Sequence, residues 1–266
     1  MANFDTAQSP YLLRTVVRAV TVLDEFLESE EELGVTEVSR RTGLHKSIVF
    51  RNLVTLTSCG LLAPGTSEGT YRLGTKALTL GLAYLQHSPL ERVSQSHLLS
   101  LADECPRFTF HVAILSNTEI VYQKSARGAH ADQPPTVIGR RENAYCSALG
   151  KILLAYLAPP ELEQFLNTVK LEPRTPNTIT SPTLFTKELD LVREREWALD
   201  NKENFHDRMC VAVPIRDYSG RVTAALSLAA NSDDFERYGL DAAVELVKST
   251  AAAVSFDLGY QPAHTI

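Results

Sequence analysis

Residues 35–62 read VTEVSRRTGLHKSIVFRNLVTLTSCGLL, and this stretch decides the fold of the first part of the chain. Thr36 is expected to cap a short helix, because its hydroxyl can accept a backbone N–H of the first turn. This helix should end at Thr42, because Gly43 tolerates the left-handed conformation that closes a helix. A second helix is expected to start near His45–Ser47. Two helices joined by so short a turn form a helix-turn-helix.

The second helix of this motif has two chemically different faces. Val49, Leu53 and Leu56 follow the spacing of an apolar seam and should pack inward. The opposite face carries Lys46, Ser47, Phe50, Arg51 and Thr55. Because this face is cationic and has no acidic residue, it suits the major groove of DNA, and we predict that it contacts DNA.

Charge is unevenly distributed along the chain. The net charge is −6, yet the window Val38–Ser67 contains no Asp or Glu, and its basic residues are Arg40, Arg41, Lys46 and Arg51. A basic patch confined to one supersecondary unit is what local phosphate binding requires. A merely solvated face would have the same composition, so the charge supports DNA binding only together with the helix pattern.

A hairpin is predicted directly after the two helices. Leu61–Ala63 and Thr70–Leu73 have the pattern of short strands, and the PGTSEG between them supplies proline and glycine for a turn. Arg72 on the second strand is expected to reach a phosphate or the minor groove. With an amphipathic helix over Leu12–Leu27 in front, the prediction for residues 10–74 is a winged helix-turn-helix domain.

A different organisation is expected beyond residue 74. Residues 75–87 form a predicted linker helix that is apolar on most sides, so it packs either on a partner subunit or within its own chain. Residues 88–262 are predicted to form an α+β domain with helices on an antiparallel sheet. Its expected strands are Thr109–Leu115, Ile120–Gln123, Val211–Arg216 and Val222–Ala229, and its expected helices include Ser147–Leu157, Glu188–Trp197 and Tyr238–Leu258.

Composition excludes several classes of protein. No apolar run approaches the ~20 residues that a membrane span needs, and the first residues lack the pattern of a secretory signal. We expect a cytoplasmic protein without membrane contact. The cysteines show no CxxC pair, so neither a metal site nor a cofactor is predicted; they are Cys59, Cys105, Cys146 and Cys210.

Several stretches together resemble one family of proteins. Residues 35–62, followed by GTYRLG at 69–74, resemble the start of IclR-type transcriptional regulators. Residues 139–157, GRRENAYCSALGKILLAYL, and the runs within 188–230 resemble the effector-binding domain of that family. The resemblance implies a sensor domain related to GAF and profilin-like folds. It also implies a homodimer, or a dimer of such dimers, that binds double-stranded operator DNA and a small organic-acid or aromatic effector.

An effector site is expected in the second domain. Ser147, Ala148 and Gly150 bring hydroxyl and backbone N–H donors to a helix start, which suits a carboxylate. Arg140 or Arg141 is a candidate countercharge. By resemblance, three further residues should line the same cavity: Asp200, Cys210 and Ser227.

The chain also departs from the family pattern at the expected sites. Ala229 stands where a second serine occurs, and Tyr145 stands where a histidine is frequent. These changes favour an effector that is larger or more apolar than a very small oxoacid. At the mouth of the expected recognition helix, His45 replaces a common proline and Ile48 a common threonine, which bears on the DNA sequence that is read.

Two other functions remain open from the sequence. A cysteine-dependent enzyme would use Cys210 or Cys146 with a base such as His111, His130 or His206. A metal-responsive regulator would need a ligand cluster that no His or Cys spacing indicates. We expect a regulator without catalytic residues, and the sequence does not decide between an activator and a repressor.

Overall fold

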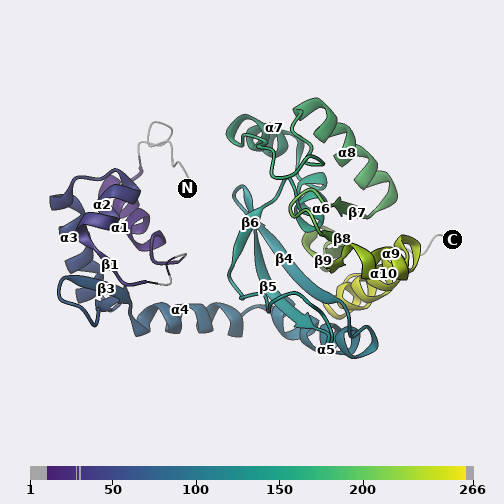
Figure 1. Cartoon of the computed structure of the whole chain (residues 1–266), viewed down its shortest axis with the longest axis horizontal. Helices are drawn as coiled ribbons and strands as arrows, with labels where there is room; N and C mark the ends of the chain where they lie inside the picture. The colour runs from purple at the N-terminus through teal and green to yellow at the C-terminus, as the bar shows by residue number, and fades with distance from the viewer. Residues whose placement is uncertain (1–10, 28, 30, 262–266) are drawn as a thin grey trace. The chain divides into compact units, whose positions relative to one another are not determined.

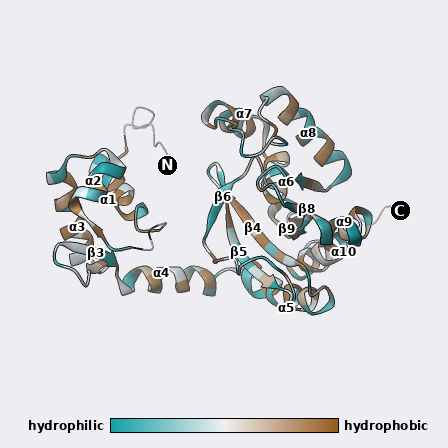
Figure 2. Cartoon of the chain, in the orientation of Figure 1, coloured by the Kyte–Doolittle hydropathy of each residue, from teal (hydrophilic) through white to brown (hydrophobic). Residues whose placement is uncertain are grey.

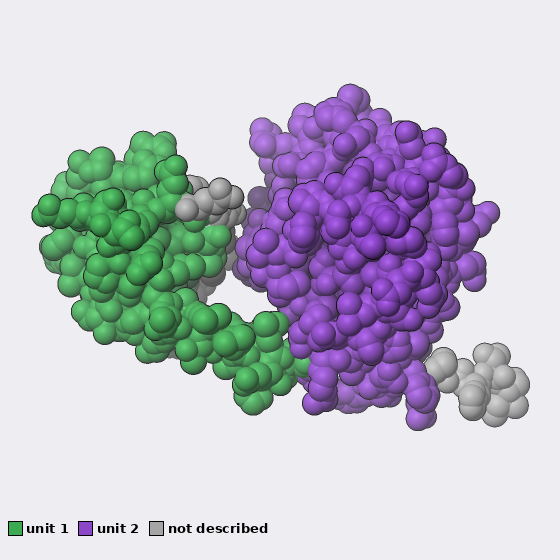
Figure 3. Space-filling model, turned by 60° about the horizontal axis from the view of Figure 1, so that its bottom comes forward, with its two compact units in different colours: residues 1–88 green, residues 89–266 purple. Residues whose placement is uncertain are grey.

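The structure, a computed structural model, describes residues 11–27, 29 and 31–261. The chain divides into two compact units, residues 1–88 and 89–266 (Figure 3). The predicted domain ranges 10–74, 75–87 and 88–262 begin at residue 10 and end at residue 262, and both of these residues lie outside the described part.

The first unit is a winged helix-turn-helix, as predicted (Figure 1). Its three short strands form an antiparallel sheet in the order β1-β3-β2. Its elements are α1 (Arg14–Asp24), β1 (Leu33–Gly34), α2 (Val35–Thr42), α3 (Lys46–Ser58), β2 (Leu62–Pro64), β3 (Thr70–Leu73) and α4 (Thr75–Gln86).

Helix α3 packs on the core of this unit through the predicted seam. Val49 and Leu53 are fully buried, and Leu56 is nearly so. They join Val22 and Phe26 from the first helical segment in one apolar cluster. Burying three such side chains contributes about 1.5–3 kcal/mol each relative to exposure. This burial orients the opposite face of α3 toward solvent.

The caps of the two helices differ from the prediction at one end. Gly43 ends α2 with a φ of 70°, as predicted. The prediction that Thr36 caps α2 is wrong, because Gly34 occupies the N-cap position. Gly34 pairs with Thr70 in the small sheet, so the strand leads directly into the helix, whose N-cap lies two residues earlier than predicted. At α3, the ring of His45 serves as the cap.

The second unit is built on a six-stranded antiparallel sheet, which confirms the predicted α+β class. The strand order is β6-β5-β4-β9-β8-β7. The strands are β4 (Thr109–Ser116), β5 (Glu119–Arg127), β6 (Arg141–Asn143), β7 (Ala198–Asn201), β8 (Arg208–Arg216) and β9 (Val222–Asn231). The helices are α5 (Pro89–Glu104), α6 (Ala148–Ala155), α7 (Pro159–Thr168), α8 (Pro182–Arg195), α9 (Ser232–Tyr238) and α10 (Leu240–Asp257).

The two faces of this sheet pack on different helices. Leu226 and Leu228 of β9 lie in a cluster with side chains of α5 and α10. Ala225 is an odd number of residues away from both, so its side chain lies on the other face, in a cluster with side chains of α6. Small side chains on that face allow α6 to approach closely. Gly150 shows how closely, because a Cβ there would overlap the backbone of Ala144.

Candidate DNA interface and effector site

The outer face of α3 is exposed and cationic. Lys46, Ser47, Arg51 and Thr55 are exposed, and Phe50 retains 52% of its accessible surface. Among the described residues, no carboxylate lies within ion-pair distance of Lys46 or Arg51. The Thr55 hydroxyl donates to the Arg51 carbonyl at 2.7 Å, which leaves its oxygen lone pairs outward. The face therefore offers free cations to phosphate and hydrogen-bonding groups to bases.

Arg40 and Arg41 on α2 are placed differently from the α3 residues. Each forms an ion pair with Glu37, with N–O distances of 2.6 Å in both pairs. Hydrogen bonds from the two guanidinium groups lower the pKa of Glu37 to about 2. Their charge is partly neutralised inside the protein. Arg72 on β3 is exposed, and it has no ion pair among the residues described.

Glu32 holds the turn of the hairpin, a role that the sequence did not indicate. Its carboxylate accepts the Thr66 N–H at 2.7 and 2.8 Å and the Ser67 N–H at 3.3 Å. The Thr70 hydroxyl also donates to it at 2.8 Å. These bonds, the one from Thr66 first, lower the pKa of Glu32 to about 2. Gly65 leaves room for the contact, since a Cβ there would overlap the carboxylate.

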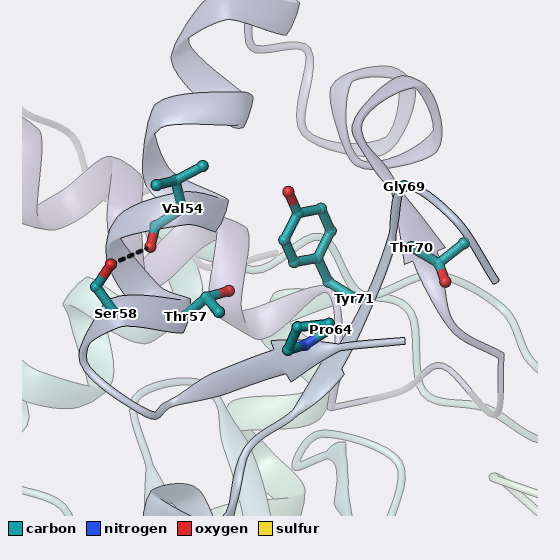
Figure 4. Close-up of a pocket in the computed structure, with 7 residues that line it drawn as sticks. All are labelled: Val54, Thr57, Ser58, Pro64, Gly69, Thr70 and Tyr71. Atoms are coloured by element: carbon teal, nitrogen blue, oxygen red, sulfur yellow. Dashed lines mark hydrogen bonds between the residues drawn. The ribbon is translucent and has the colours of Figure 1, made fainter. Parts of the chain in front are cut away.

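A groove of about 310 Å³ separates α3 from the hairpin (Figure 4). The ring of Tyr71 stands between Val54 on α3 and the strand that carries Thr70. Val54 is 43% exposed, so the groove continues the outer face of α3 with an apolar surface. The hydroxyls of Thr57 and Ser58 donate to backbone carbonyls one turn earlier, at 2.8 and 2.9 Å. The groove joins the recognition helix to the wing as one continuous surface.

The structure brings the six predicted effector residues to one face of the large sheet. Asp200 pairs with Cys210 across β7 and β8, and Ala212 on β8 pairs with Ser227 on β9. Directly opposed residues of antiparallel strands point to the same face. Helix α6, which begins with Ala148, packs on β8 and β9 from that side.

The start of α6 is closed by its own cap. Ser147 is 6% exposed, and its hydroxyl oxygen accepts the Gly150 N–H at 3.1 Å. The predicted use of the Gly150 N–H as a carboxylate donor therefore competes with this bond. Gly150 itself is required by its close approach to Ala144. What remains for a ligand is the Ser147 hydroxyl hydrogen and the first N–H groups of the helix.

Asp200 organises the turn that follows β7. Its Oδ1 accepts the N–H groups of Glu203 at 2.7 Å and Asn204 at 3.3 Å. Burial raises the pKa of Asp200 to about 7. The neighbouring Glu203 forms an ion pair with Lys151 of α6 in the interior. The carboxyl of Asp200 is therefore partly protonated near pH 7.

The two candidate countercharges, Arg140 and Arg141, have different partners in the structure. Arg141 pairs with Glu119 at 2.8 Å and with the Ser116 carbonyl at 3.2 Å. Arg140 pairs with Glu142 at 3.2 Å, and Glu142 also accepts from the Tyr122 hydroxyl at 2.9 Å. Tyr122 lies opposite Ala113 on the α6 side of the sheet. Arg140 is therefore linked through Glu142 to Tyr122 on the α6 side of the sheet. Arg141 is bound instead by the turn that contains Ser116 and Glu119.

The cysteine and histidine of this face are not activated for catalysis. Burial raises the pKa of Cys146 to about 12 and that of Cys210 well above its ordinary value. Burial, with Arg208 and Arg140 adding to it, lowers the pKa of His111 to about 3. Its Nε2 lies 2.9 Å from the Thr136 hydroxyl. A thiol with a raised pKa is a poor nucleophile, which argues against a cysteine-dependent enzyme.

In the described part of the chain, no group of three His, Cys, Asp or Glu side chains is arranged to hold a metal ion. No helix among the same residues is long and apolar enough to cross a membrane. A groove of about 750 Å³ between α6, α7 and α8 is lined by residues such as Tyr156 and Leu166, and none of the six predicted effector residues lines it.

Three residues at one end of the α6-facing side of the sheet were not singled out by the sequence analysis. Arg208 and Thr109 begin strands β8 and β4, and Gln133 lies in the segment after β5. The expected strand began at Val211, so the alternation that puts Arg208 on the same face as Cys210 was not visible. The run MCVAV continues the alternation backward to Arg208, and this was the available signal.

Comparison with known proteins places the chain in a family. The family model of the IclR helix-turn-helix domain matches residues 15–64, and that of the bacterial transcriptional regulator IclR C-terminal domain matches residues 82–256. The HTH-type transcriptional regulator KdgR of Escherichia coli K12 is 32% identical over 260 residues, covering 98% of each chain. A p-hydroxybenzoate hydroxylase transcriptional activator from Acinetobacter baylyi is 27% identical over 242 residues, covering 89% of this chain and 88% of that protein.

The solved structures agree. The crystal structure of Thermotoga maritima IclR is similar, with a TM-score of 0.67 and 28% identity over 93% of this chain and 99% of that one. Both units of the chain are thus accounted for by one family, and the relatives named are regulators. The chain belongs to the IclR family of bacterial transcriptional regulators, and it is a DNA-binding regulator rather than an enzyme.

Proposed function

We propose that the chain acts as a homodimer that reads two halves of an operator and changes its DNA affinity when an organic acid binds the second unit. The observation that carries this proposal is the outer face of α3, where Lys46 and Arg51 are exposed without a carboxylate partner in the described residues. Free cations on a helix with a buried apolar seam are what a major-groove contact requires.

Within this proposal the DNA-contacting residues have different roles. Lys46 and Arg72 contact phosphates, as exposed cations on different elements, and Arg51 and Ser47 reach base edges. Phe50 supplies apolar contact with thymine methyl groups. The remaining members of the interface assist from α2 and from the far end of α3: Arg40, Arg41 and Thr55.

The proposed homodimer is supported by the apolar residues of α4, which colour parts of its ribbon brown in Figure 2. No residue of this helix is buried. Four large apolar side chains remain about half or more exposed: Leu78 at 64%, Leu80 at 55%, Leu82 at 48% and Tyr84 at 53%. A solvent-exposed apolar helix favours a partner. We propose that two copies of α4 pack on each other, and a dimer of dimers would extend the same assembly in the cytoplasm.

The effector is proposed to be an organic or aromatic acid. It would bind on the sheet face beside Ser147, Ala148, Gly150, Asp200, Cys210 and Ser227. Similarity to an activator of a hydroxylase that acts on p-hydroxybenzoate supports this chemistry. Binding of the effector biases one arrangement of the dimer and so shifts the population that fits both half-sites.

The experiment that tests DNA reading compares three proteins on a duplex selected from a random library. Arg51→Ala should lower the affinity about 5- to 150-fold, the range expected for one good bidentate base contact. Arg221→Ala, an exposed arginine of the β8–β9 turn, serves as control and should bind as the wild type does. Fluorescence anisotropy measures both. Equal affinity of Arg51→Ala and wild type would exclude α3 as the reading element.

The assembly is tested separately by sedimentation velocity. Leu82→Glu puts a charge into the proposed α4 contact and should convert the dimer to monomer. Leu184→Glu changes an exposed leucine of α8 in the same way and should leave the dimer intact. A wild-type protein that sediments as a monomer would refute the homodimer.

A further inference from the structure

The guanidinium of Arg208 lies without an ion-pair partner among the described residues, at one end of the α6-facing side of the sheet. Arg208 and Cys210 are two residues apart on β8, so both side chains point to the α6 side of the sheet. In the described part of the chain, no carboxylate lies within ion-pair distance of Arg208. Its guanidinium rests over the ring of Phe205 at 4.5 Å, which keeps it half-buried and oriented.

Two carboxylates beside the register partner of Arg208 are bound by other side chains. Asn231, the register partner of Arg208, donates to Asp132 at 2.8 Å and to Asp234 at 3.1 Å. Asp234 also pairs with Arg237 at 3.0 Å. A half-buried arginine without a counterion is costly to maintain and favours an anionic partner from outside the chain.

Two buried polar atoms at the same end of the sheet as Arg208 have no hydrogen-bond partner among the described residues. They are the Thr109 hydroxyl and the Gln133 side-chain nitrogen, on residues that are 1% and 7% exposed. Native proteins leave few such groups, and each one calls for an explanation. Both atoms act as donors, so an acceptor-rich ligand would satisfy both.

The sheet register places these donors on one surface. Cys210 pairs with Ala229, and Ala229 pairs with Thr109, so the three side chains form a row on one face. The row spans two strand spacings, about 9–10 Å. Thr109 is opposite Arg127, whose Nε donates to the Gln133 carbonyl at 2.6 Å, and this bond brings Gln133 to the same end of the sheet.

The charge and the small side chains around Arg208 and Thr109 indicate which class of ligand could bind there. The positive charge of Arg208 helps to lower the pKa of the buried His111. Between Cys210 and Thr109 lies Ala229, which is 2% exposed and belongs to neither apolar cluster described for the unit. The surroundings suit a charged head with a compact apolar body.

We propose that Arg208, Thr109 and Gln133 form an anion subsite that binds the carboxylate of an apolar or aromatic monocarboxylic acid, with the body of the acid against Ala229. The subsite rests on the proposed function, since it assigns the charged end of the effector. It lies apart from the Ser147 helix start, where the cap already uses the Gly150 N–H.

Thermal shift of the full-length protein with two matched pairs of probes tests the subsite. Benzoate and hexanoate should raise the melting temperature of the wild type, and benzamide and hexanamide should have little effect. Arg208→Gln should weaken binding of benzoate about tenfold or more, the loss expected for one charge-assisted contact. Arg208→Lys should restore part of the affinity, and Arg221→Gln, at the other end of the same strand pair, should bind as the wild type does.

Thr109→Val separates ligand binding from folding. Its hydroxyl has no partner within the described chain, so the isosteric valine should leave the unliganded protein equally or more stable. The same variant should bind benzoate more weakly than the wild type. A ligand-free melting temperature well below the wild-type value would show that the hydroxyl is structural and would overturn its assignment.

The outcomes for the subsite and for the proposed function are distinct. Equal stabilisation of wild type and Arg208→Gln by benzoate overturns the subsite, even if benzoate still alters operator binding. Loss of benzoate binding in Arg208→Gln, without any effect of benzoate on operator binding by the wild type, keeps the subsite and refutes the effector role. No stabilisation of the wild type by either carboxylate overturns the subsite.

Discussion

The two units of this regulator use ion pairs in opposite ways. Lys151 and Glu203 pair inside the second unit, with side chains that are 1% and 7% exposed. Glu37 pairs with Arg40 on the surface of the first unit, where the side chains are 34% and 71% exposed. A buried pair is costly to break, and an exposed pair contributes little to folding. The first pair therefore maintains the shape of its unit, and the second partly neutralises Arg40 with little effect on folding.

The same contrast extends to the binding surfaces. The DNA-binding unit presents Lys46 and Arg51 to solvent, because a long polyanion must reach them from outside. The second unit buries Asp200, His111 and Thr109, and a small ligand is typically recognised by a few such desolvated polar groups. Substitutions of the exposed cations should therefore affect binding alone, whereas substitutions of buried groups that have partners within the chain should also affect folding.

The largest effect on folding is expected from Lys151→Met. It leaves the Glu203 carboxylate without its cation in the interior, which should destabilise the second unit by about 3–5 kcal/mol. Trp197 is the single tryptophan of the chain and lies in this unit, so urea unfolding followed by its fluorescence reports the change. Lys170→Met removes an exposed partner of Glu172 and should change little.

A second substitution tests whether the loss comes from the unpaired charge. Adding Glu203→Leu to Lys151→Met removes the carboxylate as well and should recover much of the stability, because apolar replacement of a buried pair is often neutral. If the double variant is no more stable than the single one, the loss comes from packing around Lys151.

A somewhat smaller effect is expected from pH. The pKa of Asp200 is raised from 3.8 to about 7, so between these values the folded protein holds a proton that the unfolded chain has lost. Its contribution to stability is full below about pH 4 and is lost as the pH rises to about 7, with an upper limit of about 4 kcal/mol. The charged or titratable groups around it are Cys146, Lys151, Glu203 and Cys210.

Asp200→Asn isolates this contribution. The amide oxygen still accepts the turn N–H groups, but the side chain no longer titrates. The difference in unfolding free energy between wild type and Asp200→Asn should therefore change between pH 4 and 8. A constant difference over that range would show that Asp200 keeps an ordinary pKa.

A still smaller effect on folding, with a measurable effect on DNA binding, is expected from Glu32→Ala. Loss of the carboxylate frees the N–H groups of Thr66 and Ser67, so their amide hydrogen exchange should accelerate. Operator binding should weaken because the hairpin that carries Arg72 is less ordered. Glu31→Ala changes a neighbouring exposed acid and provides the control. Unchanged exchange at Thr66 in Glu32→Ala would contradict the assigned role.

The smallest effect on folding is expected from Glu37→Gln, and it should improve DNA binding. Without the carboxylate, Arg40 and Arg41 are both available to phosphates. The slope of log affinity against log salt should become steeper by about 1–2, at roughly 0.9 per added phosphate contact. Anisotropy titrations at several salt concentrations measure the slope. An unchanged slope would place both arginines outside the interface.

Much of the first unit could be predicted from local patterns. The seam of α3, the end of α2 at Gly43 and the hairpin follow from residues close together in the chain. The predicted N-cap of α2 was two residues too late, because Gly34 takes part in a sheet with distant Thr70. In the second unit the main strands were found, but α7, α9 and the short strands β6 and β7 were not, since segments of this length carry weak periodic signals.

The sequence by itself determined the two faces of α3, because the helical repeat sorts Leu53 and Arg51 to opposite sides without help from the rest of the chain. Only the tertiary structure decided which charges are free. It gave Glu37 to Arg40 and Arg41, placed Glu32 in the hairpin turn and left Arg208 unpaired. Sheet register sets Thr109 beside Ala229 and Cys210, and register depends on how distant strands pair, which no local pattern contains.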